Sequence, residues 1–114
     1  MWINKECSNL YDLLLGSGFP ILSLGFSGEK EKENLDFVSK ASLERHGKKL
    51  AVGFISNVNI EDEETIMQRY RRIEENVGRD NIRYIQPDCG FGITPPEKVR
   101  LILEKMNKVA RNIV

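Results

Sequence analysis

Asp88 and Cys89 are the residues of this 114-residue chain whose chemistry and position together indicate a reactive site. They lie in the segment IQPDCGFGITP, between an apolar run that ends in Pro87 and the predicted start of a helix after Thr94. Thiolates bind metals and attack electrophiles, and a glycine-rich loop lets the backbone turn sharply and approach a ligand. The nearby helix start favours a thiolate or an anion. A small half-buried cysteine in a tight turn is the alternative interpretation.

Few side chains in the sequence are natural partners for Cys89. The other cysteine, Cys7, is remote in sequence, so no close cysteine spacing predicts a disulfide scaffold. The single histidine, His46, lies at the predicted end of a helix, where a solvated cation is favoured by the helix dipole. A stand-alone role for Cys89 as nucleophile or redox sensor therefore ranks last, because no histidine is positioned to activate it.

Apolar runs and amphipathic segments alternate along the chain, beginning and ending with a helix. The predicted strands span residues 20–26, 48–56 and 81–86, and the predicted helices span residues 8–18, 31–46, 61–77 and 96–113. Such alternation predicts parallel strands joined by right-handed crossovers. Parallel strands are usually buried on both faces, which agrees with the unbroken apolar run LAVGFI.

Two predicted helices carry more detailed signals. The helix over residues 31–46 is expected to be continuous, and the residues near its apolar face are Leu35, Val38, Ser42 and Leu43. The last helix begins with the sequence TPPE, in which Thr94 and Glu97 form a capping box. Its inward-facing residues are predicted to be Val99, Ile102, Leu103, Met106, Ala110 and Ile113.

The predicted fold is therefore α/β, with three consecutive β/α units and parallel strands in a single domain over residues 1–114. Three strands cannot close a parallel barrel, which takes about eight strands and about 250 residues. The chain is thus a small open sheet or a piece of a larger barrel. In both architectures functional loops follow the carboxyl ends of the strands. Those loops contain SGEKE, NVNIE and DCGFGIT.

Composition limits the classes of partner and location. Lysine plus arginine and aspartate plus glutamate each number 17, so the formal net charge is zero, which argues against a nucleic-acid or acidic-membrane partner. No apolar run approaches the roughly 18–20 residues of a membrane span. The N-terminal sequence MWINKECSN lacks the apolar core of a secretory signal. We expect a soluble, cytoplasmic protein with reduced thiols.

The motif PDCG, set between an apolar strand and a helix, resembles the C-terminal end of the cobalamin-independent methionine synthases. The segments LYDLLLGSGFPILSLGF and GFISNVNIEDEETIMQR resemble the two preceding units, so the resemblance extends from Trp2 to Val114. It implies the last part of a TIM (β/α)8 barrel. It also implies transfer of a methyl group from a methyltetrahydrofolate polyglutamate, or another donor, to a homocysteine thiolate that zinc activates, without cobalamin.

The resemblance implies one zinc ligand in this chain, Cys89. The glutamate that the family carries at the end of an earlier strand corresponds to Gly25, and the family's His-x-Cys pair corresponds to Trp2 and Asn4. One thiolate does not hold zinc at useful affinity, because catalytic zinc sites usually take three protein ligands.

Other acidic residues of the chain are possible oxygen donors to a metal. Glu29, Glu31 and Asp88 are the carboxylates nearest to the predicted site, although their spacing alone does not require metal binding. Glu61 matches a glutamate of the family, and its position at a helix start indicates a cap or a dipole partner.

The combined prediction is a methionine-synthase-like protein that is not catalytic alone and contributes a half-site. A companion chain, or another copy, would supply the missing strands and ligands. A non-enzymatic scaffold or binding module derived from the barrel is the alternative. Unpaired strand edges also predict a homo-oligomer, most simply a two-fold dimer, through residues 20–26 or 81–86 or through Trp2 and Ile3.

Overall fold

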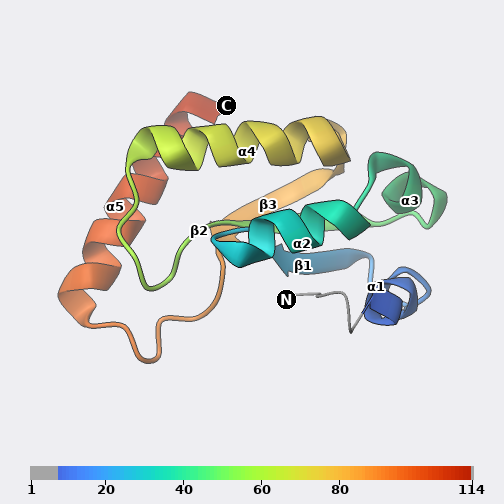
Figure 1. The fold of residues 1–114 in the computed structure, drawn as a ribbon, viewed down its shortest axis with the longest axis horizontal. Helices are drawn as coiled ribbons and strands as arrows, with labels where there is room; N and C mark the ends of the chain where they lie inside the picture. The colour runs from blue at the N-terminus through green and yellow to red at the C-terminus, as the bar shows by residue number, and fades with distance from the viewer. Residues whose placement is uncertain (1–7, 114) are drawn as a thin grey trace.

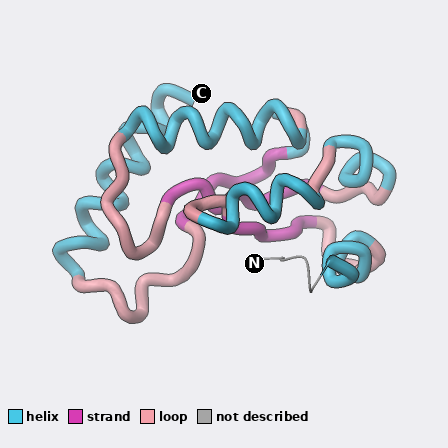
Figure 2. The backbone as a smooth tube through the Cα atoms, viewed as in Figure 1, coloured by secondary structure: helices cyan, strands magenta, loops and turns pink. Residues whose placement is uncertain are grey.

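The computed structural model describes residues 8–113 of the chain (Figure 1). In chain order the elements are α1 (Ser8–Leu15), β1 (Ile21–Gly25), α2 (Glu29–Phe37), α3 (Lys40–Arg45), β2 (Lys49–Ile55), α4 (Glu63–Val77), a short 3-10 helix (Arg79–Asn81), β3 (Ile82–Pro87) and α5 (Pro96–Ile113). The helices pack beside a small sheet of three strands (Figure 2). The predicted alternation of helices and strands is confirmed, with one additional α-helix and the short 3-10 helix.

The sheet is parallel throughout, and its three strands follow one another in the order β1-β2-β3. The β1–β2 register runs from Ile21 opposite Lys49 to Gly25 opposite Gly53. The β2–β3 ladder contains two register shifts, the second of which brings Pro87 opposite Ile55. Because all three strands are parallel, their carboxyl ends lie at the same edge of the sheet, as the sequence predicted.

The hydrophobic core lies on one face of the sheet. Side chains from alternating strand positions form one cluster with the helices, and the strand members include Leu22, Leu24, Leu50, Val52 and Phe54. The helical members include Ile66, Ile73 and Val77 of α4 and Ile102 and Val109 of α5. The first helix contributes Tyr11 and Leu15 to the same cluster. One cluster of buried side chains therefore joins the helices to the strands.

The opposite face of the sheet is built differently, and the expectation of strands buried on both faces is wrong for β1 and β3. Ser23 is exposed, and the side chain of Tyr84 is 52% exposed. Gln86 donates a hydrogen bond from Nε2 to Ser23 Oγ at 2.5 Å, across the central strand. Only β2 is buried after its first residue, because it is the central strand and its second-face residues, Ala51 and Gly53, are small.

The segment predicted as one helix over residues 31–46 is two helices. The chain leaves helical geometry at Val38 and Ser39, which have extended backbone angles. Ser39 then caps α3, because its hydroxyl oxygen accepts a hydrogen bond from the Ser42 N–H at 3.1 Å. Asn76 of α4 donates to the Val38 carbonyl that the break leaves without a helical partner. The local capping chemistry of Ser39 therefore outweighs the helical periodicity.

The inward face predicted for the last helix is confirmed at Ile102, and Met106 and Ile113 pack against the core, but Leu103 departs from it. Its buried residues are Ile102 and Val109, whereas Leu103 is 40% exposed. Val109 lies seven residues after Ile102, or two helical turns, so these residues share a face. The predicted capping box is also absent from the hydrogen bonds within residues 8–113, because the Thr94 hydroxyl donates to the Asn57 carbonyl at 2.9 Å. Thr94 thus ties the loop after β3 to the loop after β2.

Candidate functional site

Asp88 lies at the carboxyl edge of the sheet and closes the ends of β1 and β2. Its backbone N–H donates to the Ile55 carbonyl at 2.9 Å, so the chain crosses over the end of the central strand. Its Oδ1 accepts a hydrogen bond from the Phe26 N–H at 3.0 Å, at the end of β1. One residue therefore connects all three strand ends.

Two glycines make room for this arrangement. A Cβ atom on Gly53 would lie 2.9 Å from the Asp88 Cα and 3.1 Å from its Oδ1. A Cβ atom on Gly25 would lie 3.1 Å from the same oxygen and 3.3 Å from Lys30 Cδ. Any larger residue at position 53 would displace the backbone of Asp88, since real Cβ atoms do not approach that closely. The carboxyl group of Asp88 therefore occupies the space above Gly25.

The second carboxyl oxygen of Asp88 has no hydrogen-bond partner among the residues that the structure describes. Oδ2 is buried, and the side chain is 0% exposed. Its nearest cation is the Lys30 ammonium group, whose Nζ lies 3.6 Å from Oδ2. Burial raises the pKa of Asp88 above its ordinary value, although the charge of Lys30 and the Phe26 and Ser27 N–H groups oppose that rise. Most buried side-chain oxygens have a hydrogen-bond partner, so the ion pair with Lys30 is the main compensation for burying this one.

Cys89 follows directly and is exposed as a free thiol. Its Sγ lies 3.8 Å from the Nζ of Lys30. Lys30, from the first turn of α2, therefore contacts both the buried carboxyl group of Asp88 and the exposed sulfur of Cys89. Lys30 follows β1, whereas Asp88 and Cys89 follow β3, and these are the two outer strands of the sheet. We call these three side chains the Asp88–Lys30–Cys89 cluster.

A buried arginine fixes the loop on the other side of this edge. Arg69 of α4 is 4% exposed and donates to the Phe54 carbonyl at 2.9 Å. Its guanidinium pairs with Glu61 through two hydrogen bonds, of 2.9 Å and 2.5 Å. It also donates to Glu31 of α2 at 3.3 Å, and Glu31 in turn pairs with Arg72. This network ties α2, α4 and the loop after β2 into one unit.

Glu61 is a member of this network and not a helix cap. Asp62 caps α4, because its side chain accepts from the Thr65 N–H. The Glu61 carboxylate accepts from the Ser56 N–H at 3.0 Å and from Arg69. Burial alone would raise the pKa of Glu61, but these hydrogen bonds outweigh it and hold the pKa below its ordinary value. Glu61 is therefore an ionised anchor for the loop between β2 and α4.

The structure brings together only some of the residues predicted for the site. Asp88 and Cys89 are adjacent at the sheet edge, whereas Glu31 points its carboxylate to two arginines. His46 is exposed at the C-cap of α3, which precedes the start of β2 and so lies at the opposite end of the strands. Trp2, Ile3, Asn4, Cys7 and the side chain of Glu29 lie outside the described residues.

The described residues do not by themselves fit a catalytic zinc ion. Among the side chains that the structure describes, no group of three or more from histidine, cysteine, aspartate or glutamate is close enough to hold a metal. Cys89 offers a thiolate and Asp88 a carboxylate oxygen, but a catalytic zinc site usually takes three ligands. Lys30 also places its ammonium group against both of these donors. A further ligand would have to come from outside this part of the chain.

Lys30 is the site residue that sequence reasoning missed. Its position in the first turn of α2 follows from a helix start at Glu29, two residues earlier than predicted. The glycine at position 28, with a φ of 57°, was the signal for that start.

Comparison with known proteins adds no relative. No model of a known protein family matches the sequence, and no curated protein sequence matches it. The described helices include none that is long and apolar enough to cross a membrane. The methionine synthase resemblance therefore stays a prediction, based on the motif PDCG and the segments around it.

Proposed function

We propose that this chain contributes a half-site to methyl transfer onto the thiol of homocysteine, within the last part of a (β/α)8-type barrel. The observation that carries the proposal is the Asp88–Lys30–Cys89 cluster, which presents an exposed thiol at the carboxyl edge of parallel strands. Functional groups of parallel α/β proteins gather at that edge. Sequential parallel strands with helices on one face are also what a sector of such a barrel requires.

Each residue of the cluster would have its own role in positioning the thiol. Asp88 anchors the loop by its hydrogen bonds to the ends of β1 and β2, so that the sulfur of Cys89 is held at a fixed position. Lys30 neutralises the buried carboxyl group and contacts that sulfur. Zinc, when bound, would act as a Lewis acid toward the substrate thiol. The chain is not expected to catalyse the reaction alone, because the described residues supply too few ligands.

A non-enzymatic scaffold is the second candidate, and a specific contact favours it. The Lys30 ammonium group lies between Asp88 and Cys89, so a cation already compensates the donors that a metal would use. In that case Cys89 is a turn residue and the loop serves only to close the sheet edge. The two candidates differ in whether the sulfur of Cys89 can bind a metal once Lys30 is removed.

Cobalt binding tests this difference, because a cobalt–thiolate bond gives a charge-transfer absorption that zinc lacks. The purified chain is titrated with cobalt(II) alongside the variants Lys30→Ala, Cys89→Ser and, as a matched control, Lys32→Ala. Lys32 is an exposed lysine of the same helix. We expect a weak thiolate band in the wild type, a stronger one in Lys30→Ala, no change in Lys32→Ala and no band in Cys89→Ser. Absence of the band from both the wild type and Lys30→Ala would leave the scaffold as the better account.

Assembly into a two-fold dimer is part of the same proposal. Tyr84 of β3 is 52% exposed and Leu103 of α5 is 40% exposed. Exposed apolar side chains beside the last strand of a sheet favour association. Sedimentation equilibrium at micromolar concentration is expected to give a mass that rises above the 13.1 kDa of one chain. A substitution Tyr84→Glu is expected to shift the equilibrium toward monomer, and a mass of one chain at every concentration would contradict the dimer.

A further inference from the structure

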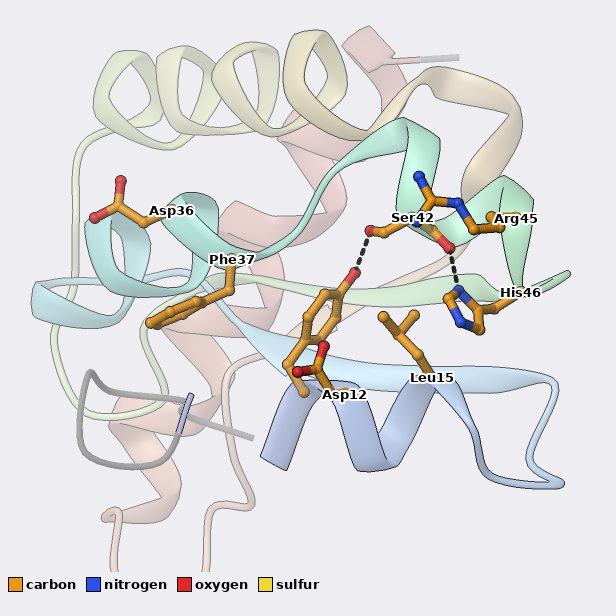
Figure 3. A pocket seen from close by; sticks show the side chains of 8 residues that line it. Asp12, Leu15, Asp36, Phe37, Ser42, Arg45 and His46 are labelled. Carbon is orange, nitrogen blue, oxygen red and sulfur yellow. Dashed lines mark hydrogen bonds between the residues drawn. The ribbon is translucent and has the colours of Figure 1, made fainter. Parts of the chain in front are cut away.

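A cavity lies at the opposite end of the strands from Cys89. It has a volume of about 410 Å³ and is enclosed by α1, the end of α2 and α3 (Figure 3). Its lining residues are Tyr11, Asp12, Leu15, Asp36, Phe37, Ser42, Arg45 and His46. Because α1 and α3 precede the first residues of β1 and β2, the cavity is at the amino edge of the sheet. It is therefore separate from the Asp88–Lys30–Cys89 cluster.

The floor of this cavity is apolar and fixed in place. Tyr11 and Leu15 are buried members of the core, and Phe37 packs against it. The Tyr11 hydroxyl and Ser42 Oγ are hydrogen-bonded at 2.9 Å, which joins α1 to α3 (Figure 3). The chain is extended at Val38 and Ser39, between α2 and α3, and both helices contribute residues to the lining of the cavity.

Charged side chains of both signs surround the floor without neutralising one another. Asp12 lies on α1 and Asp36 on α2, whereas Arg45 lies on α3. Among the described residues none of these three side chains takes part in a hydrogen bond or an ion pair. Elsewhere on the same surface such groups do pair, as Glu31 does with Arg72. The acidic and basic sides of the cavity are thus held apart by its apolar floor.

The histidine beside Arg45 has a defined tautomer. His46 Nδ1 lies 2.9 Å from the Ser42 carbonyl oxygen (Figure 3). A carbonyl oxygen only accepts hydrogen bonds, so Nδ1 carries a proton and donates it. Nε2 is then left for another partner, and it donates as well when the ring is protonated. Arg45 and His46 together form the basic side of the cavity.

We propose that this cavity binds a short zwitterionic peptide of dipeptide size with apolar side chains. The peptide ammonium group would face Asp12 and Asp36, and its carboxylate would face Arg45 and, when the imidazole is protonated, His46. Its apolar body would cover the floor. A dipeptide fits better than a free amino acid, because the acidic and basic groups come from different helices on opposite sides of that floor. A volume of about 410 Å³ also falls in the ordinary range of small-molecule pockets.

The probe is L-alanyl-L-phenylalanine, and the readout is the change in backbone amide chemical shifts of the full chain. Two blocked forms of the same probe serve as comparisons: the N-acetyl form, which lacks the ammonium charge, and the C-terminal amide, which lacks the carboxylate. We expect saturable shifts around Tyr11, Ser42 and His46 with the free dipeptide. Each blocked form is expected to bind about three- to tenfold more weakly, which is the range for losing one charged contact at a partly exposed site.

Substitutions assign the two charges separately. Arg45→Gln is expected to weaken the free dipeptide about three- to tenfold and to leave the amide form unaffected. Asp12→Asn is expected to weaken the free dipeptide and to spare the N-acetyl form. Arg111→Gln, at an exposed arginine in the last turn of α5, is the matched control and should change nothing. Retained dispersion of the amide spectrum would show that each variant is folded.

Three results would overturn the proposal. The shifts could fail to saturate, the free and blocked dipeptides could bind equally, or the variants at positions 12 and 45 could behave as the control does. None of these measurements involves Cys89 or a metal ion. The peptide site and the methyl-transfer half-site can therefore fail independently.

Discussion

Replacing Arg69 tests whether the carboxyl edge of the sheet depends on a buried charge network. Its side chain is 5% exposed, and those of its partners Glu61 and Glu31 are 17% and 18% exposed. Arg69→Met keeps most of the side-chain length and volume, so packing is largely retained. The substitution removes the hydrogen bond to the Phe54 carbonyl and leaves two carboxylates without their shared cation.

The expected cost follows from what each carboxylate retains. Breaking a buried ion pair by removing one partner costs about 3–5 kcal/mol. Glu31 keeps its pair with Arg72, and Glu61 keeps the Ser56 N–H, so part of the loss is offset. We therefore expect Arg69→Met to lower the free energy of unfolding by about 2–4 kcal/mol. For a domain of this size that corresponds to a fall in melting temperature of about 8–16 °C.

Urea unfolding of a double-mutant cycle measures the coupling directly. Glu61→Gln removes the charge of the partner and keeps its shape, so the double variant with Arg69→Met should be less destabilised than the sum of the two single changes. We expect a coupling of about 1–2 kcal/mol. Arg71→Met, at an exposed arginine of the same helix, is the control and should stay within about 0.5 kcal/mol of wild type. A loss below about 1 kcal/mol for Arg69→Met, or strict additivity with Glu61→Gln, would refute the reasoning.

The order and direction of the strands were predictable because they depend on patterns that extend over whole segments. The apolar run LAVGFI predicted β2, and the alternation of apolar runs with amphipathic segments predicted the sequence of helices and strands along the chain. Short-range chemistry was harder to weigh against these patterns. The sequence around Ser39 is compatible with a helix interior and with a helix cap. A break there is stable only if the backbone carbonyls that it exposes accept hydrogen bonds from other donors. Asn76, which lies 38 residues after Val38, donates a hydrogen bond to the Val38 carbonyl.

The candidate site was predictable in its location and not in its contacts. Its location followed from the rule that functional loops come after parallel strands. The contact of Lys30 with Asp88 and Cys89 spans about half of the chain and depends on the space above Gly25 and Gly53. No local pattern in the sequence indicates the space above these two glycines. A glycine in a strand indicates a close approach, but it does not identify the group that approaches.

Three further predictions concern the same sheet edge. The pKa of Glu61 in the folded protein is lowered from 4.5, so the ionised side chain stabilises the fold above that pH and this stabilisation is lost as pH falls through the folded pKa. Glu61→Gln should therefore flatten the acid side of the stability–pH curve, which urea unfolding measures. Gly53→Ala should cost about 1–3 kcal/mol, because its Cβ would lie 2.9 Å from the Asp88 Cα. The control Gly90→Ala, where nothing lies within 4 Å of the added atom, should cost less than about 0.5 kcal/mol. Cys89 should react with iodoacetamide in the folded protein faster than Cys7, because its thiol is exposed at the open ends of the strands beside the Lys30 ammonium group. Peptide mass spectrometry after timed labelling measures both rates in one sample, and Lys30→Met separates the effect of the ammonium group from that of exposure. Labelling of Cys89 that is equal to or slower than that of Cys7 would mean that the loop is closed in solution, and the sulfur would then be unavailable to a metal or a substrate.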